Sequence, residues 1–244
     1  MVSGVSAIPG WTNGGDYRLH AGSAEQLREE TCRALLGHLR NAGIPAIERY
    51  YEPGETIYGE EEHGNALYLV LEGAARIFVF SPGARWSTLR LAGPWEPLGL
   101  PIPGSCPSGM ARAEAVAFSK LAKIPKVFVD RAVRESPETA LKLTTLYGLE
   151  LALREELFWC LLTRNTEVRL ARLLPVLARQ FPGANSTIGI RLTHYDLAAM
   201  VASTRESVNT ALTALRRRGI VKKKGGTITV LRPEALSEIG CGQH

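Results

Sequence analysis

The sequence predicts an α+β fold in which a β-barrel of short strands is followed by a long helix and a C-terminal winged helix-turn-helix. Three observations lead to this fold. Short apolar runs separated by turn residues fill positions 44–124, a helical stretch covers 136–164, and two amphipathic helices with a tight joint lie within 192–218. A length of 244 residues is enough for two domains, each with its own core.

The composition is that of an ordinary globular protein, with 45% hydrophobic and 22% charged residues. Its four cysteines, Cys32, Cys106, Cys160 and Cys241, form no CxxC pair, so we expect reduced thiols and no metal site. The N-terminus lacks the basic and apolar regions of a signal peptide, and no apolar run reaches about 18 residues. We therefore expect a cytoplasmic protein with no membrane partner.

The N-terminal half divides into an arm and a β-domain. Residues 1–22 are rich in Gly, Ser and Asn, which is typical of a flexible arm. A helix of about residues 23–39 opens the next domain, 23–135, and the short strands follow it. A hairpin turn or a bulge is expected at Glu72 and Gly73, because glycine adopts the positive φ that other residues resist.

The long helix begins with three agreeing signals at Ser136, Pro137 and Glu138: an N-cap, a proline in the first turn, and an acid at the positive end of the dipole. At 1.5 Å per residue it spans about 40 Å, more than a small domain needs. We predict that residues 136–164 form the dimerisation helix of a homodimer, with packing on its own domain as the alternative. The predicted seam consists of Leu143, Leu146, Leu153, Leu157 and Cys160.

Charged residues lie close to this seam. Glu150 interrupts it, and Arg154 and Glu155 follow one turn later. Charges in such a position are costly unless they are paired or bound by a ligand. They are therefore either interhelical salt bridges or ligand contacts.

The C-terminal domain, 165–244, starts with a helix that Asn165 caps and that ends before Pro182. Pro175 lies inside this helix and is expected to kink it. A strand is predicted at 186–192, directly before the helix-turn-helix.

In the helix-turn-helix, Thr193 is the predicted N-cap of the first helix and Ala202-Ser203 is the joint. The second helix buries one face, made of Val208, Leu212 and Leu215. Its other face carries the candidate base-reading residues Arg205, Glu206, Asn209 and Thr210. A hairpin after Gly219 forms the wing.

The candidate base-reading residues lie nearest the N-terminal end of the second helix. In helix-turn-helix proteins that end enters the major groove, so double-stranded DNA is the expected partner. Arg205 suits guanine O6 and N7, and Glu206 suits cytosine N4. Residues 205–232 include eight basic residues and a single acidic one, which favours a polyanionic partner. The remaining DNA-binding candidates, which carry hydroxyl or ammonium groups, are Thr193, Ser203, Thr204, Ser207, Lys222, Lys223 and Lys224. A helical pair that binds protein is the alternative.

The chain resembles the CRP/FNR transcription regulators in the segments PGETIY, LYLVLEGAARI, GPWEPLG, RLARLL and LTHYDLAAMVASTRESVNTALTALRRRGIV. EAVAF, GIRLTH and STRESV are most similar to the cyanobacterial global nitrogen regulator branch, which senses 2-oxoglutarate. The resemblance implies a cyclic-nucleotide-binding-type β-barrel, which is a double-stranded β-helix or jelly roll, and a homodimer that binds a two-fold symmetric operator. It also implies RNA polymerase as a partner.

Departures from the family pattern bear on the effector. Leu98-Gly99-Leu100 stands where the cyclic-nucleotide pocket carries Phe-Gly-Glu, and SCPSGMARAEA contains no Arg-Ser pair, so cyclic AMP is not expected. Glu155 matches a glutamate of the 2-oxoglutarate branch, whereas Glu150 stands at an arginine position. The effector candidates are therefore Leu98, Gly99, Leu100, Arg112, Glu150, Arg154 and Glu155.

Two modes of control remain open. The effector is 2-oxoglutarate or another small anion, for which Arg112 and Arg154 are candidate cations, or the pocket is filled by Leu98 and Leu100 and the regulator acts without an effector. An iron–sulfur cluster is not expected, because the sequence lacks the cluster of N-terminal cysteines that the FNR branch of the family carries. Haem is not expected because His38 and His63 are isolated. An enzyme on the barrel is also not expected, since its histidines are dispersed.

Two further departures lie in the helix-turn-helix. Ala202 stands where the family has a turn glycine, which predicts local strain or a shifted joint. Thr210 stands at a base-contacting position that is often arginine, which predicts an altered preference at that base pair.

Overall fold

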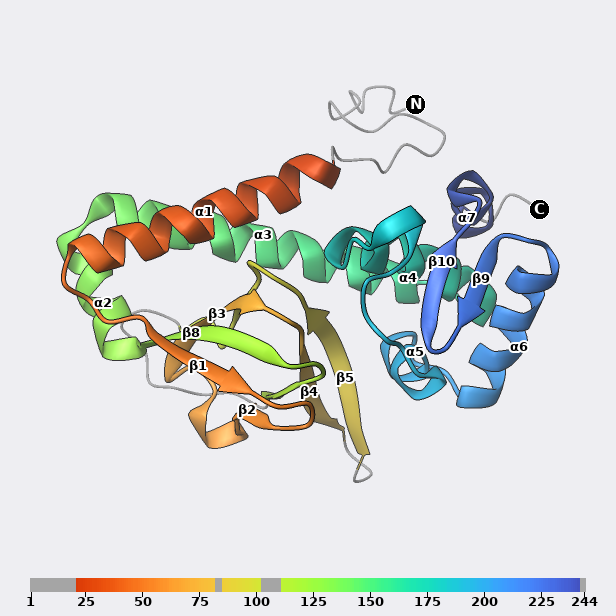
Figure 1. Ribbon diagram of the computed structural model, residues 1–244, viewed down its shortest axis with the longest axis horizontal. Coiled ribbons are helices and arrows are strands. Elements are labelled where there is room, and N and C mark those ends of the chain that lie inside the picture. The colour runs from red at the N-terminus through yellow and green to blue at the C-terminus, as the bar shows by residue number, and fades with distance from the viewer. Residues whose placement is uncertain (1–20, 82–84, 102–110, 242–244) are drawn as a thin grey trace, which may run out of the picture.

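The structure is a computed structural model that describes residues 21–81, 85–101 and 111–241 (Figure 1). Strands of the N-terminal half form two antiparallel sheets, in the orders β1-β8-β3-β6 and β2-β7-β4-β5. The strands are β1 (Ile47–Tyr51), β2 (Thr56–Tyr58), β3 (Ala66–Glu72), β4 (Ala75–Ser81), β5 (Arg85–Ala92), β6 (Pro97–Leu98), β7 (Ala111–Ala115) and β8 (Ser119–Pro125). A 3₁₀ turn, η1 (Glu60–Glu62), follows β2. These sheets form the predicted β-barrel.

The barrel encloses a core that both sheets supply. Tyr58 comes from one sheet and Tyr68 and Leu121 from the other, and each is at most 1% exposed. The turn expected at Gly73 is present, with a φ of 83°, but β3 and β4 lie in different sheets, so the turn connects the two sheets and does not close a hairpin. A Cβ at this glycine would lie 2.3 Å from the carbonyl oxygen of Phe118, so both the backbone angle and the close approach require glycine.

Three helices lie on one side of the barrel: α1 (Ala21–Asn41), α2 (Lys126–Glu135) and α3 (Pro137–Leu161). Figure 1 shows α1 lying along α3. Leu35 and Leu39 of α1 and Leu146 of α3 share one core with the barrel. Helix α1 runs two residues further at each end than predicted, α2 was not predicted, and the predicted arm lies outside the described residues except for its last two positions.

The predicted start of the long helix is confirmed. The Ser136 hydroxyl oxygen accepts a hydrogen bond from the Thr139 backbone N–H at 3.1 Å, and Pro137 occupies the first turn. This cap satisfies one of the backbone donors that a helix leaves unbonded at its start.

The structure corrects the predicted dimer seam. Its residues are Leu143, Leu146, Leu153, Leu157 and Cys160. All but the half-buried Leu157 are at most 6% exposed within the single chain, where they pack with the barrel, α1 and the next helix. The large apolar residues of the opposite face are 59–67% exposed, namely Leu141, Leu151, Phe158 and Leu162. Spacing does not distinguish a face packed on the chain's own core from one that a partner covers.

Between residues 165 and 241, the C-terminal part contains four helices and a hairpin around one core. They are α4 (Thr166–Gln180), α5 (His194–Met200), α6 (Arg205–Arg217), β9 (Val221–Lys224), β10 (Thr227–Val230) and α7 (Pro233–Gly240), with a 3₁₀ turn, η2 (Ala184–Ser186). Asn165 caps α4 as predicted, Pro175 lies inside α4, and α7 was not predicted. The strand predicted at 186–192 is wrong, because only isolated bridges form there and Asn185 and Ser186 have positive φ.

The C-terminal part docks directly on the barrel, with α5 beside β5 (Figure 1). Ala74 and Leu91 of the barrel belong to the same apolar core as α4. A Cβ at Gly93 would lie 2.9 Å from the Gln180 carbonyl oxygen, which shows how closely the backbones approach. None of the described helices combines the length and hydropathy needed to cross a membrane.

Candidate DNA interface and effector region

The first helix of the helix-turn-helix, α5, begins with a reciprocal capping box. The Thr193 hydroxyl oxygen accepts from the Asp196 N–H at 3.1 Å, and the Asp196 carboxylate accepts from the Thr193 N–H at 2.8 Å. The predicted N-cap is thus confirmed. Asp196 is buried, and its other carboxylate oxygen accepts from Arg76 of the barrel at 2.7 Å.

The joint between the two helices has the strain that its sequence predicts. Ala202 has a φ of 47°, in the left-handed region where a side chain is unfavourable. Arg169 of α4 donates to the carbonyl oxygens of Val201 and Ala202, at 2.7 and 2.9 Å. The Ser203 hydroxyl is hydrogen-bonded to that of Thr166 at 2.9 Å. Helix α4 therefore holds the turn in place.

We expect the substitution Ala202→Gly to raise the free energy of unfolding by about 0.5–1 kcal/mol, because glycine relieves the left-handed strain. Thermal or urea unfolding measures the change. The matched control is Ala214→Gly, inside α6, which should lower stability by a similar amount. A loss of stability in both variants would mean that the joint is not strained.

The second helix, α6, presents its predicted faces. Val208, Leu212 and Leu215 are at most 2% exposed and anchor the helix. The four candidate base-reading residues are all exposed to solvent, namely Arg205, Glu206, Asn209 and Thr210. The N-cap is Thr204, whose hydroxyl oxygen accepts from the Ser207 N–H at 3.1 Å.

The wing is the hairpin of β9 and β10, which turns at Gly225 and Gly226 with positive φ. Lys222 and Lys224 are exposed, whereas Lys223 is half-buried because alternate residues of a strand face opposite sides. The Leu192 N–H donates to the Gly226 carbonyl oxygen at 2.9 Å. This bond ties the wing to the segment that leads into α5.

Residues that sequence reasoning missed lie beside this surface. The Arg205 guanidinium carbon is 5.2 Å from the ring centroid of the exposed Tyr195, within reach of a cation–π contact. Arg191 and His194 line the same hollow as Tyr195, together with Lys223, which the sequence did predict. The sequence signal was available, since basic and aromatic residues flank the capping Thr193.

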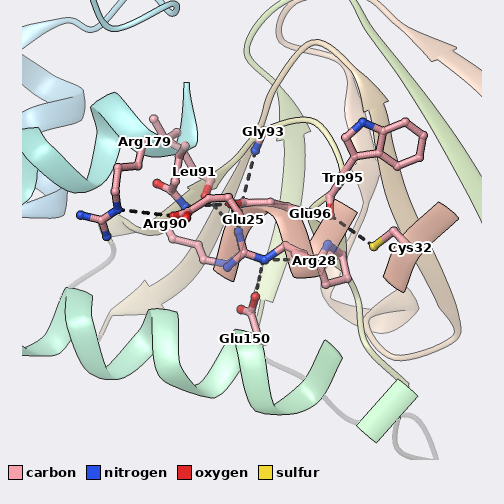
Figure 2. A network of polar contacts seen from close by, with 12 residues as sticks. Glu25, Arg28, Cys32, Arg90, Leu91, Gly93, Trp95, Glu96, Glu150 and Arg179 are labelled. Carbon is pink, nitrogen blue, oxygen red and sulfur yellow. Dashed lines mark hydrogen bonds and ion pairs between the residues drawn. The ribbon is translucent and has the colours of Figure 1, made fainter. Parts of the chain in front are cut away.

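Glu150, one of the effector candidates on the long helix, belongs to a buried ionic network (Figure 2). Arg90 of β5 donates to Glu150 and to Glu96, each at 2.9 Å. Glu96 also accepts from Arg28 of α1 at 3.2 Å and from Gln180 of α4 at 3.1 Å. Four separate segments therefore meet at two carboxylates.

The charges of the four buried members of this network balance. Arg28, Arg90, Glu96 and Glu150 are each at most 6% exposed, which gives two guanidiniums and two carboxylates. Burial raises the pKa of Glu96 although Arg90 and Arg28 act against it. For Arg90, burial would lower the pKa, but Glu150 and Glu96 outweigh it and raise the pKa. The exposed Arg154 adds a contact to Glu150 at 2.9 Å.

The other effector candidates are dispersed. Leu98 is a core residue of the barrel, Leu100 packs against the core beneath α1, and Gly99 has a φ of 62° at a close approach to Ala66. Arg112, on β7, lies near Glu114 and Phe78. Glu155 is exposed. Of the predicted set, the network brings together Glu150 and Arg154, and it joins them to Arg28, Arg90 and Glu96, which the sequence did not single out.

A winged helix-turn-helix with an exposed basic reading face, docked on an effector-type β-barrel, defines a DNA-binding regulator. The Crp-like helix-turn-helix domain family matches residues 168–239, and the Cyclic nucleotide-binding domain family matches residues 48–136. The cyclic AMP receptor protein of Thermus thermophilus is 31% identical over 80% of this chain and 88% of its own length. The chain belongs to the CRP/FNR family of transcription regulators.

Other relatives carry different names. The global nitrogen regulator of Synechococcus elongatus is 26% identical over 86% of this chain and 97% of its own length. The structure of FixK2 from Bradyrhizobium japonicum matches with a TM-score of 0.72 and 25% identity, over 80% of this chain and 96% of that one. These relatives are transcription regulators rather than enzymes. Because their names point to different signals, family membership does not select an effector.

Proposed function

We propose that this protein is a homodimeric regulator that reads a two-fold symmetric operator with α6. The observation that carries the proposal is the exposed N-terminal face of α6 beside a lysine-bearing wing. We further propose a barrel domain at 23–135, a dimerisation helix at 136–164 and a DNA-binding domain at 165–244. RNA polymerase is a proposed partner on the strength of the family.

The dimer contact lies, in our proposal, on the exposed face of α3. Leu141, Gly148 and Leu162 lie on one row at multiples of seven residues, which Glu155 interrupts, and Leu151 and Phe158 form a second such row. Two such rows are the pattern of a two-stranded helical seam. Gly148 lies open on this face, since a Cβ there would meet nothing within 4 Å in the single chain. Two copies joined here would present two reading helices to half-sites about 34 Å apart.

Arg205→Ala should cost about 1–3 kcal/mol on the cognate operator and relax the preference at one base pair. The matched control is Lys224→Ala on the wing, which should weaken all sequences alike and reduce the salt slope by about one. Selection from a random DNA pool finds the operator, and fluorescence anisotropy then measures both variants. Equal losses on every sequence for Arg205→Ala would contradict its role in base reading.

For control, 2-oxoglutarate or another small anion is one proposed effector, and an effector-independent regulator governed by abundance or a partner protein is the other. The charge balance of the buried network favours the second mode, because an anion bound there would have to displace Glu96 or Glu150 from Arg90.

Thermal unfolding with and without candidate ligands separates the two modes. A ligand at 100 times its Kd stabilises the folded state by about 2.7 kcal/mol, which is a readily measured rise in Tm. We expect no rise with 2-oxoglutarate, cyclic AMP or haem. A rise that grows with the concentration of one of them identifies the protein as a sensor of that ligand.

A further inference from the structure

A basic hollow lies between α5 and the wing, next to the N-terminal end of the reading helix. Its volume is about 400 Å³, and its lining includes Arg191, His194, Arg205, Lys223 and the wing turn at 225–226. The bond from Leu192 to Gly226 fixes the wing turn beside this lining. The hollow therefore brings together side chains from the segment before α5, from α5, from α6 and from β9.

Positive charges crowd into this hollow. Burial lowers the pKa of His194, and the nearby Lys223 and Arg205 lower it further. Burial also lowers the pKa of Lys223, with Arg216 acting in the same direction and Asp196 against it. Like charges held together in this way favour an anion between them.

The acid closest in sequence to His194 is already engaged. One carboxylate oxygen of Asp196 accepts from the backbone and hydroxyl of Thr193, and the other accepts from Arg76 at 2.7 Å. The Tyr195 ring stands beside the Arg205 guanidinium at the rim of the hollow. Since Asp196 is turned to these partners, its carboxylate does not occupy the hollow.

We propose that this hollow binds a phosphodiester group of the DNA backbone, and that each such contact adds one proton to the His194 imidazole. The proton comes from solvent and forms an N–H bond that donates to a phosphate oxygen. This inference rests on the proposed DNA binding. It adds Arg191 and His194 to the DNA contacts and makes operator affinity depend on pH.

The sign of the pH dependence follows from linkage. In the unbound protein burial, and after it the nearby Lys223 and Arg205, lower the pKa of the imidazole, whereas a phosphate beside it favours the charged form. Affinity is therefore highest below the pKa of the unbound protein and falls as the pH rises through the pKa of the complex. The steepest fall is about one decade per pH unit for each protomer bound.

The test measures operator affinity at constant ionic strength between about pH 5.5 and 8.5, where histidine titrates. The wild-type protein should lose affinity as the pH rises. His194→Gln should bind the operator weakly, and its affinity should not depend on pH in this range. His194→Lys should bind tightly, again without the dependence of affinity on pH. His38→Gln is the matched control, because His38 lies on α1 beside Glu138 and should keep the wild-type slope.

A second arm uses wild-type protein, so it does not depend on how the variants fold. Operators with one backbone phosphate replaced by a neutral methylphosphonate are compared in turn. One position in each half-site should abolish the pH slope. A slope that survives both His194→Gln and every methylphosphonate would overturn the inference, whereas a failure to select any DNA sequence at any pH would overturn the proposed function itself.

Discussion

Replacing Glu96 by alanine is expected to lower the free energy of unfolding by about 3–5 kcal/mol. The carboxylate accepts from Arg28, Arg90 and Gln180, and its removal leaves two buried guanidiniums to share the carboxylate of Glu150. An uncompensated buried charge is among the most costly changes that a single substitution makes. Domains are stable by only about 5–15 kcal/mol, so this variant should be close to unfolding at ordinary temperature.

Urea or thermal unfolding measures this loss, and the chain offers a matched control. Glu135 pairs with Arg131 on α2 at 2.9 Å, but both side chains are 58% exposed. Glu135→Ala should therefore change stability by no more than about 0.5 kcal/mol, since water solvates the remaining arginine. Comparable small losses for both variants would mean that Glu96 is not the anion of a buried network.

The contrast between these two glutamates also shows what the sequence can predict. Caps and turns depend on a few neighbouring residues, so Ser136, Asn165 and Thr193 identify three helix starts correctly. The strained joint at Ala202 is likewise local. Burial of Glu96 and Arg90 depends on partners 60 to 84 positions away, which no local pattern records.

Arg90 illustrates the difficulty. In β5 it is buried, whereas its neighbour Leu89 is 41% exposed, so the strand turns its arginine inward and a leucine outward. A reading by hydrophobic alternation assigns the opposite orientation. Local patterns were also insufficient for the long helix. Apolar spacing located the helix, but the face that it assigned to the dimer seam packs on the chain's own core.

Replacing Phe158 by glutamate is expected to convert the protein to a monomer without unfolding it. Phe158 is 63% exposed in the single chain, so the new carboxylate remains hydrated in the monomer but would be buried in the proposed seam. Two linked half-site contacts increase affinity by about 10²–10⁴ over one. Affinity for the symmetric operator should fall by a factor of that order, whereas affinity for an isolated half-site should not change.

Size-exclusion chromatography with light scattering gives the mass of each variant. Two other substitutions serve as controls for the position of the seam. Val127→Glu, at a residue of α2 that is 66% exposed, should remain dimeric and bind the operator normally. Leu146→Glu places a charge in the chain's own core and should unfold the protein instead of dissociating it. A dimer that persists in Phe158→Glu would mean that the two copies meet elsewhere, since one further unpaired carboxylate from each copy, beside that of Glu155, would be buried in the seam at a large cost.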